Sequence, residues 1–110
     1  MAYISQNPWT AEVLASQAFD SEHEVQQKLS QAAACEKRWS DAGFSARAQC
    51  FHQLAELLVQ HQKPLANLMH QEMGKLILEA QAEIFKSADA CRYYGNHAEA
   101  LLRCDRGFTN

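Results

Sequence analysis

The stretch EMGKLILEAQAEIFKSADACRYY, residues 72–94, contains the end of one predicted helix and the beginning of the next. Gly74 is suited to end the first helix in the left-handed conformation, and the second helix is expected to begin near Leu76. Apolar residues then recur at steps of seven, four, three and three, which places them on one helical face. They are Ile77, Ile84, Ala88, Cys91 and Tyr94. The region therefore predicts two helices joined by a short glycine-containing turn.

The second of these helices has a predicted weak point at Gly95, which costs about 1 kcal/mol relative to Ala inside a helix. Ala98, Leu101 and Leu102 favour its resumption after Gly95. Residues 105–110 give no signal for a helix or strand.

Two further helices are predicted upstream of Gly74. Pro64 is expected to start a short helix, because a missing backbone N–H does no harm in the first turn. Its predicted inner face consists of Leu65, Leu68, Met69 and Met73. Ser45 is a candidate cap for a helix over about 45–61. The apolar stripe of that helix consists of Ala48, Phe51, Leu54, Ala55 and Leu58.

The first predicted helix spans about 21–39. Ser21 and Glu24 have the Ser-x-x-Glu spacing of a capping box, and such a cap is worth ~1 kcal/mol. An apolar stripe follows at helical spacing: Val25, Leu29, Ala32, Ala33 and Trp39. The helix is expected to close near residues 41–43.

The first 20 residues have the pattern of a β-hairpin. Residues 3–6 and 13–19 are the candidate strands, and Asn7-Pro8-Trp9-Thr10 between them has turn chemistry. An isolated hairpin is marginal in water, so this one needs a surface to lean on. The predicted fold class is therefore mainly α: a hairpin over 1–20 followed by about four helices over 21–103. Nothing alternates as strand, helix, strand, so a complete nucleotide-binding sheet is not predicted.

Composition excludes several classes of function. The formal net charge of -3 and scattered basic residues argue against a nucleic-acid partner. No signal peptide and no membrane span of about 20 apolar residues is visible, so a cytoplasmic location is expected. No two of the four cysteines form a Cys-x-x-Cys pair, so free thiols are expected. They are Cys35, Cys50, Cys91 and Cys104.

The order of several short motifs resembles the amino-terminal region of aldehyde dehydrogenases, closest to the bacterial succinate-semialdehyde dehydrogenase group. Glu72-Met73-Gly74-Lys75 is followed by Glu79-Ala80, by residues 82–88 and by Cys91-Arg92-Tyr93-Tyr94. Residues 7–14, Asn-Pro-Trp-Thr-Ala-Glu-Val-Leu, resemble the family's hairpin Asn-Pro-x-Thr-Gly-Glu-Val. Ala11 stands where the family usually has the turn Gly, and Leu76 where Pro often follows the Gly-Lys pair. The resemblance covers residues 5–102.

The resemblance implies that residues 1–110 are the first part of an α/β cofactor-binding domain, whose helices pack on a Rossmann-type sheet later in the chain. The whole enzyme would oxidise an aldehyde through a thiohemiacetal on Cys, with NAD or NADP as cofactor. The family's catalytic motifs lie after this region and do not occur here. The chain alone is therefore expected to be non-catalytic and to bind no cofactor, and no residue is assigned a catalytic, cofactor-binding or metal-binding role.

Several residues nevertheless have a functional reading beside an ordinary one. Cys50 follows Gln49, but the family's nucleophile has one residue between Gln and Cys, so a structural thiol is expected. Gly74-Lys75 is a possible phosphate contact or a helix stop with a solvated Lys. Glu83 and Asp89 lie near the position of a carboxylate that helps hold a structural monovalent cation in some family members, and Glu83 is the better match. An ordinary role on the helix surface is expected.

The remaining candidates are His and aromatic side chains. The five histidines, His23, His52, His61, His70 and His97, lack ligand spacing and are expected to be solvated. Arg92-Tyr93-Tyr94 is an aromatic platform or, as expected here, a packing surface.

Two alternatives to a segment of an oxidoreductase stay open: a free-standing helical interaction module, and the remnant of a decayed gene. Amphipathic helices with unmatched apolar faces bind partners or self-associate. The expected partners are the remainder of the enzyme and further copies in a homo-oligomer. An excised scaffold segment predicts dimerisation or binding of dyes that report exposed apolar surface.

Overall fold

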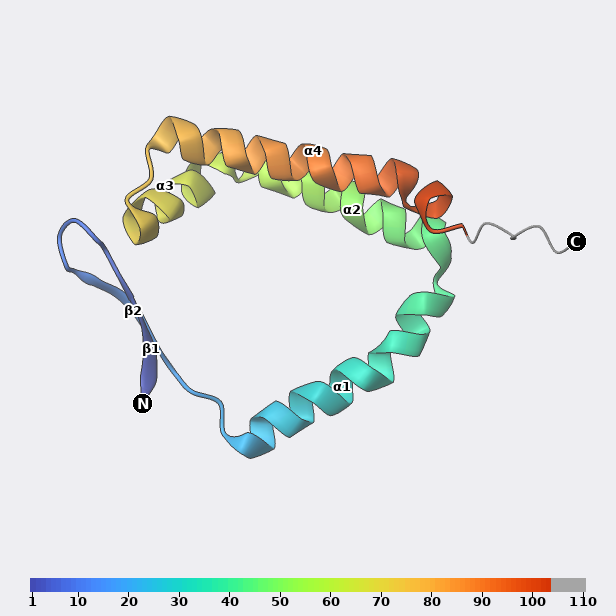
Figure 1. The fold of residues 1–110 in the computed structure, drawn as a ribbon, viewed down its shortest axis with the longest axis horizontal. Coiled ribbons are helices and arrows are strands. Elements are labelled where there is room, and N and C mark those ends of the chain that lie inside the picture. Colours follow the sequence, from blue (N-terminus) through green and yellow to red (C-terminus); the bar gives the residue numbers. More distant parts are fainter. Residues whose placement is uncertain (104–110) are drawn as a thin grey trace, which may run out of the picture.

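The computed structural model describes residues 1–103, which form a hairpin followed by four helices (Figure 1). The elements are β1 (Ala2–Gln6), β2 (Val13–Ala18), α1 (Glu22–Asp41), α2 (Gly43–Gln60), α3 (Gln62–Met73) and α4 (Ile77–Leu101). The predicted fold class and element order are confirmed. The tail 105–110 and Cys104 lie outside the described residues.

The hairpin pairs β1 with β2 in antiparallel register, with an irregularity between Ser5 and Gln6. Asn7 builds the turn, because its side-chain oxygen accepts hydrogen bonds from the backbone N–H groups of Trp9 and Thr10 at 2.9 and 3.2 Å. Ala11 has a φ of 61°, a conformation that costs a residue with a Cβ roughly 1–2 kcal/mol. The position where Ala replaces the family's Gly is therefore a strained one.

Helix α1 begins with the predicted capping box. The backbone N–H of Ser21 donates to Glu24 at 2.7 Å, and the backbone N–H of Glu24 donates to the Ser21 hydroxyl at 3.3 Å. The apolar stripe of the helix is uncovered, since none of its 20 residues is buried. Leu29 is 58% exposed and Trp39 48% exposed. The amphipathic pattern correctly predicted the helix, but its burying partner is absent from the described residues.

The junction between α1 and α2 differs from the prediction. Helix α2 begins at Gly43, with Ala42 before it and no side-chain cap, so Ser45 is not the cap. Gly43 has a φ of 80°, which turns the chain sharply within one residue. Arg47 reaches back from α2, and its guanidinium donates to the backbone oxygens of Trp39 and Ser40 at 3.5 and 3.3 Å. The elbow is therefore built from a left-handed glycine and an Arg that satisfies the last carbonyls of α1.

Helix α3 begins two residues before the predicted start, so Pro64 lies within the first turn. Gly74 ends the helix in the left-handed conformation as predicted, with a φ of 68° and an N–H bonded to the His70 oxygen. The inner face was partly wrong: Ala66 is the buried residue, whereas Leu68 and Met73 are 47% and 67% exposed. Met73 is the last residue of the helix.

Helix α4 runs without interruption through Gly95 to Leu101. Its buried residues are Ala80, Ile84 and Ala88, so the predicted stripe is right at its centre but too wide at its ends, where Ile77 and Tyr94 are exposed. Gly95 serves packing, because a Cβ there would lie 3.0 Å from the His52 ring on α2. The missing side chain lets the two helices approach closely.

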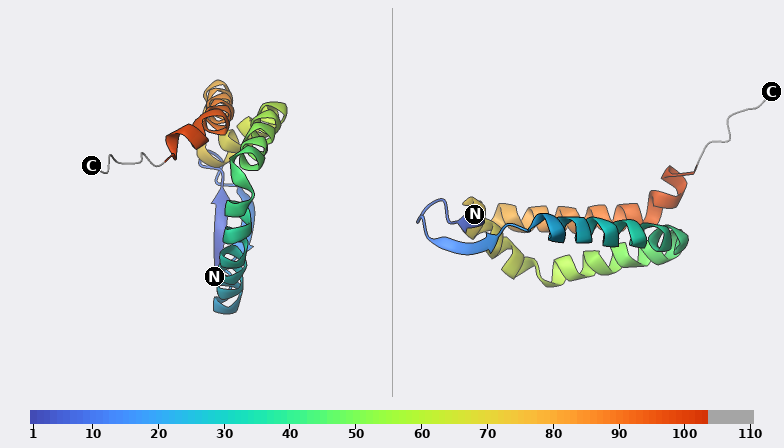
Figure 2. Two further views of the ribbon diagram at one scale, coloured as in Figure 1. Left: turned by 90° about the vertical axis from the view of Figure 1, so that its right-hand side faces the viewer. Right: turned by 90° about the horizontal axis from the view of Figure 1, so that it is seen from below.

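The core is small. The buried hydrophobic residues in the described part of the chain are Ala55, Ala66, Ala80, Ile84 and Ala88, all on α2, α3 and α4. The radius of gyration is 19.3 Å, whereas a compact domain of this length has about 13 Å. Figure 1 shows the reason: α2, α3 and α4 pack together, while the hairpin and α1 leave this bundle from opposite ends. Figure 2 shows that both project to the same side of it.

Candidate functional site

Of the three described cysteines, Cys35 has a cationic neighbour, because the Arg38 guanidinium donates to its sulfur at 3.5 Å. Cys35 and Cys50 are exposed and Cys91 is half-buried, and these three are free thiols in the described part of the chain. A reactive thiolate needs a positively charged or dipolar environment. The structural reading of Cys50, which lies on α2, stays a prediction.

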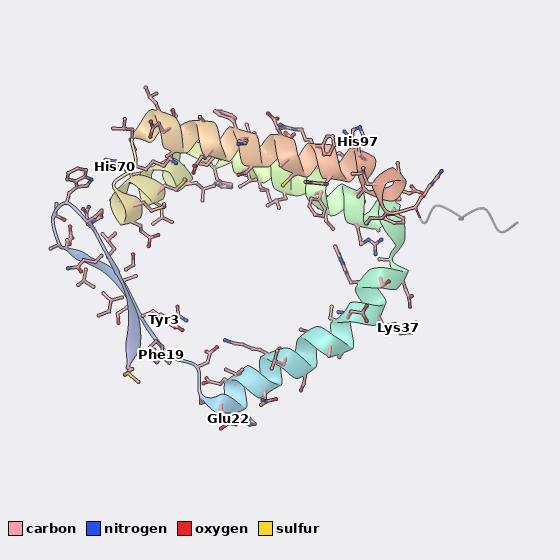
Figure 3. All side chains as sticks on the ribbon, viewed as in Figure 1. Tyr3, Phe19, Glu22, Lys37, His70 and His97 are labelled. Carbon is pink, nitrogen blue, oxygen red and sulfur yellow. The ribbon has the colours of Figure 1, made fainter. Side chains whose placement is uncertain are left out.

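Lys75 and Glu83, the two candidates at the α3–α4 junction, pair with each other. The Lys75 ammonium lies 2.5 Å from the Glu83 carboxylate. The backbone oxygen of Lys75 also hydrogen-bonds to Nδ1 of His70 at 2.7 Å (His70 is labelled in Figure 3). A phosphate at Lys75 or a cation at Glu83 would have to compete with this ion pair. Within residues 1–103, no three His, Cys, Asp or Glu side chains gather as metal ligands.

The hairpin docks on the same junction. The Ser5 hydroxyl donates to Glu72 at 2.5 Å, and the Trp9 indole lies over Gly74, where a Cβ would be 2.4 Å from its Nε1. Tyr3 and Phe19 pack edge to face at the other end of the hairpin, with ring centroids 4.4 Å apart (Figure 3). The hairpin is therefore held at its turn by α3, and its free end carries an aromatic pair.

Arg92 is engaged in ion pairs and does not form a platform with its neighbours. It pairs with Glu56 on α2 at 2.9 Å and with Asp89 at 3.1 Å, and the hydrogen bond to Glu56 is the main reason that the pKa of Arg92 is raised. Tyr93 stacks on His97 at 4.5 Å between centroids, with 15° between the ring planes. Because Tyr93 is 50% exposed, it is not covered by another element among residues 1–103, and its packing role stays a prediction.

An apolar groove, which sequence reasoning missed, lies at the elbow between α1 and α2. This elbow groove has a volume of about 490 Å³. Its large apolar lining residues are Trp39 from α1, Phe44 and Phe51 from α2, and Tyr94 and Leu102 at the end of α4. The Arg47 guanidinium covers the Phe44 ring at 4.7 Å. The lining is mainly apolar, and its polar residues are Ser45, Arg47, Asn96 and Glu99.

The elbow groove and the apolar stripe of α1 (Val25, Leu29, Ala32, Ala33 and Trp39, here called the α1 stripe) are part of a larger exposed surface. The chain exposes 9176 Å², whereas a compact monomer of this mass exposes roughly 6,100 Å². Among residues 1–103, twenty-two large hydrophobic side chains are exposed, and they come from both strands and all four helices. Exposed apolar side chains in this number are typical of a segment that contacts another protein surface. In the described part of the chain, no helix is long and apolar enough to span a membrane.

The sequence pattern of one protein family matches nearly the whole chain. The family profile described as the aldehyde dehydrogenase family matches residues 2–106, and the chain belongs to this family. The resemblance found in the sequence is confirmed.

Two relatives of the chain within this family are succinate-semialdehyde dehydrogenases. The chain is 31% identical over 102 residues to the succinate semialdehyde dehydrogenase [NAD(P)+] of Escherichia coli (strain K12). It is 37% identical over 106 residues to succinate-semialdehyde dehydrogenase [NADP(+)] 1 of Mycobacterium ulcerans. Each alignment covers 93% of this chain and 22% of the relative. The chain thus spans about a fifth of the length of the curated relatives it matches.

Solved structures agree on the fold. The chain superposes with a TM-score of 0.83 and 32% identity on the Streptococcus pyogenes succinic semialdehyde dehydrogenase in complex with NADP+, covering 93% of this chain and 23% of that one. The HpcC protein from Thermus thermophilus gives a TM-score of 0.85 with 26% identity, over 94% and 20% of the two chains. The open shape is therefore the shape that the matching region has in those longer chains.

Proposed function

We propose that residues 1–110 serve as the first part of the cofactor-binding domain of an NAD(P)-dependent aldehyde dehydrogenase. Membership of the family supports this, together with one structural observation: helix α1 has an apolar stripe and no buried residue. A helix with a solvent-exposed apolar stripe is stable in a protein only when another surface covers it. That surface is the remainder of the enzyme.

The proposed reaction of the whole enzyme is oxidation of succinate semialdehyde to the acid. The names of the relatives support this substrate and a nicotinamide cofactor, NAD or NADP. The cofactor accepts hydride in such a reaction. No residue among those described is assigned to bind it, to act as nucleophile or base, or to hold a metal, because the family's motifs for these roles fall outside the chain.

The proposed contribution of this segment is mechanical. The hairpin docks through Ser5 and Trp9 on the α3–α4 junction, and the elbow at Gly43 sets the direction of α1. The hairpin and α1 both carry exposed apolar side chains. In this proposal the remainder of the enzyme, and not the α2–α4 bundle, covers those side chains. We further propose a cytoplasmic homo-oligomer, which the relatives' family favours.

The test is to isolate the polypeptide that carries these residues from its own cells and to measure its intact mass and activity. Since 93% of this 12.4 kDa chain corresponds to 22% of the relative's length, the expected mass is roughly 52 kDa by the average composition of globular chains. It should reduce NAD+ or NADP+ only when succinate semialdehyde is present. A native polypeptide of 12.4 kDa would reject the proposal and favour the interaction module.

A further inference from the structure

The elbow groove contains two charged side chains, Arg47 and Glu99, among its apolar ones. The Glu99 carboxylate already has a partner, since the Arg103 guanidinium lies 3.6 Å from it. Arg47, in contrast, takes part in none of the ion pairs within residues 1–103. The groove therefore contains one cation that has no counter-charge in the described part of the chain.

The surroundings of the Arg47 guanidinium favour such a counter-charge. The side chain is half-buried, and its guanidinium lies over the Phe44 ring at 4.7 Å. Its two hydrogen bonds, to the backbone oxygens of Trp39 and Ser40, both come from Nη1. These oxygens are uncharged, and Nε and Nη2 have no acceptor among residues 1–103. A guanidinium of this kind is suited to a carboxylate, which accepts two parallel hydrogen bonds from it.

The walls of the groove determine what accompanies the carboxylate. Phe44, Phe51 and Tyr94 provide aromatic surface around a volume of about 490 Å³. Figure 1 shows the place, where α1 meets the start of α2 beside the end of α4. An occupant that matches this groove combines apolar side chains for the aromatic walls with one Asp or Glu for Arg47.

The α1 stripe indicates where the occupant comes from. Trp39 belongs both to the α1 stripe and to the groove lining. Under the proposed function, the remainder of the enzyme covers the α1 stripe, and the chain spans only 22% of the relatives it matches. The part of the enzyme that covers Trp39 therefore also reaches the elbow groove.

We propose that the elbow groove is a docking site for an apolar segment of the remainder of the same polypeptide, and that an Asp or Glu of that segment pairs with Arg47. This inference rests on the proposed function, because it requires a remainder. It adds the place of one contact and the chemistry of the segment that makes it. An Arg surrounded by aromatic side chains is a typical centre of such a contact.

Carbodiimide coupling of the native polypeptide with Arg47→Lys tests the proposed ion pair. Lysine keeps the positive charge and supplies an amine, which carbodiimide joins to a carboxylate that lies against it. Peptide mass spectrometry should find an amide bond from this amine to an Asp or Glu outside residues 1–110, within one polypeptide. Gln49→Lys is the matched control, since Gln49 is exposed on α2 and outside the groove lining, and it should not couple to that carboxylate.

A second label does not depend on the lysine variant. A photoreactive analogue of phenylalanine in place of Phe51, which lines the groove, should mark the same segment while Arg47 is unchanged.

Exchanging the two charges separates ion pairing from the structural role of Arg47 at the elbow. Arg47→Glu should lower the yield of assembled, active enzyme roughly tenfold or more, because two carboxylates then meet in an apolar contact. Changing the coupled carboxylate to Lys in the same enzyme should restore most of that yield. A change in the partner would not repair the loss of the hydrogen bonds to Trp39 and Ser40 alone.

Three results would overturn the proposal. They are an active enzyme in which neither label reaches a segment outside residues 1–110, coupling only to a carboxylate within residues 1–110, and coupling between two polypeptides, which would assign the groove to a subunit contact. A charge exchange that restores nothing would also contradict it. The proposed function is decided separately, because an active native polypeptide without the crosslink contradicts the docking site alone.

Discussion

Helices α1 and α4 have similar lengths, 20 and 25 residues, and both carry apolar residues on one face. Yet α4 buries Ala80, Ile84 and Ala88 against its neighbours, and α1 buries nothing within this chain. The difference shows that periodicity in a sequence reports the need for a partner and does not say where the partner comes from. For α4 the partners are the two preceding helices, whereas no element among residues 1–103 buries a residue of α1.

The packed region depends on small side chains. Four of the five buried residues are Ala, and Gly95 lets the His52 ring of α2 approach α4. Small residues allow close helix contact but bury little apolar area each, so the bundle relies strongly on its one large buried side chain, Ile84, which is 5% exposed.

The largest expected difference in stability between a substitution in α4 and one in α1 is at Ile84. Ile84→Ala should lower the free energy of unfolding by about 2 kcal/mol or more, because it removes transfer energy and leaves a cavity. Leu29→Ala on α1 should change it by less than about 0.5 kcal/mol, as expected at an exposed site. Urea titrations followed by helical circular dichroism, with the chain kept monomeric by dilution, provide the measurement. Equal effects at the two positions would mean that α1 is packed in the free chain.

A smaller effect is expected at the hinge between α3 and α4. Gly74→Ala should cost roughly 1–2 kcal/mol, since a Cβ is strained at a φ of 68°, and it should also displace Trp9 from the junction. Gly43→Ala is the control, because its φ is 80° but no atom lies within 4 Å of the added Cβ. Hydrogen exchange should therefore increase in β1 and β2 for the Gly74 variant only. Unchanged exchange would mean that the hairpin does not depend on this contact.

Removing the N-terminal cap of α1 should lower the stability of that helix alone. Ser21→Ala should reduce the stability of α1 by ~1 kcal/mol, seen as faster hydrogen exchange over residues 22–26 and not in α4. Ser30→Ala, at an exposed position in the same helix, should leave these amides unchanged. A loss spread evenly over the chain would contradict the independence of α1 from the bundle.

The smallest effect depends on pH. The hydrogen bond from the Ser21 backbone N–H lowers the pKa of Glu24 below its ordinary 4.5, so the ionised form stabilises the start of α1. This contribution is complete above the ordinary pKa and disappears as the pH falls through the lowered value. NMR shifts of the α1 amides between pH 6 and 2 should show it, and Glu24→Gln should remove the dependence. An unchanged titration in that variant would assign the effect to another carboxylate.

Much of the fold follows from the sequence because local rules determine it. The capping box at Ser21, the left-handed end at Gly74 and the turn chemistry at Asn7 each act within a few residues. The start of α2 was wrong because Gly43 holds a positive φ and Arg47 satisfies the carbonyls of α1 from a distance. Those interactions replace the side-chain cap that Ser45 would have provided.

The candidate site was less predictable. Sequence order gave the family, but the elbow groove joins residues from α1, α2 and α4 that are up to 63 positions apart, from Trp39 to Leu102. No local pattern brings such residues together. The pairing of Lys75 with Glu83 was also missed, although a Lys eight residues before a Glu, across a helix start, was the available signal.

The most direct test of the scaffold role is a chimera in which residues 2–106 replace the matching segment of the Escherichia coli relative. The chimera should oxidise succinate semialdehyde within about tenfold of the parent rate, a difference of ~1.4 kcal/mol in barrier. Leu29→Asp in the chimera should abolish assembly and activity, whereas Gln27→Asp should not. Two results would contradict the scaffold role, in which α1 packs this segment against the rest of the enzyme. One is a chimera that assembles but is inactive, and the other is a chimera whose assembly and activity do not change with Leu29→Asp.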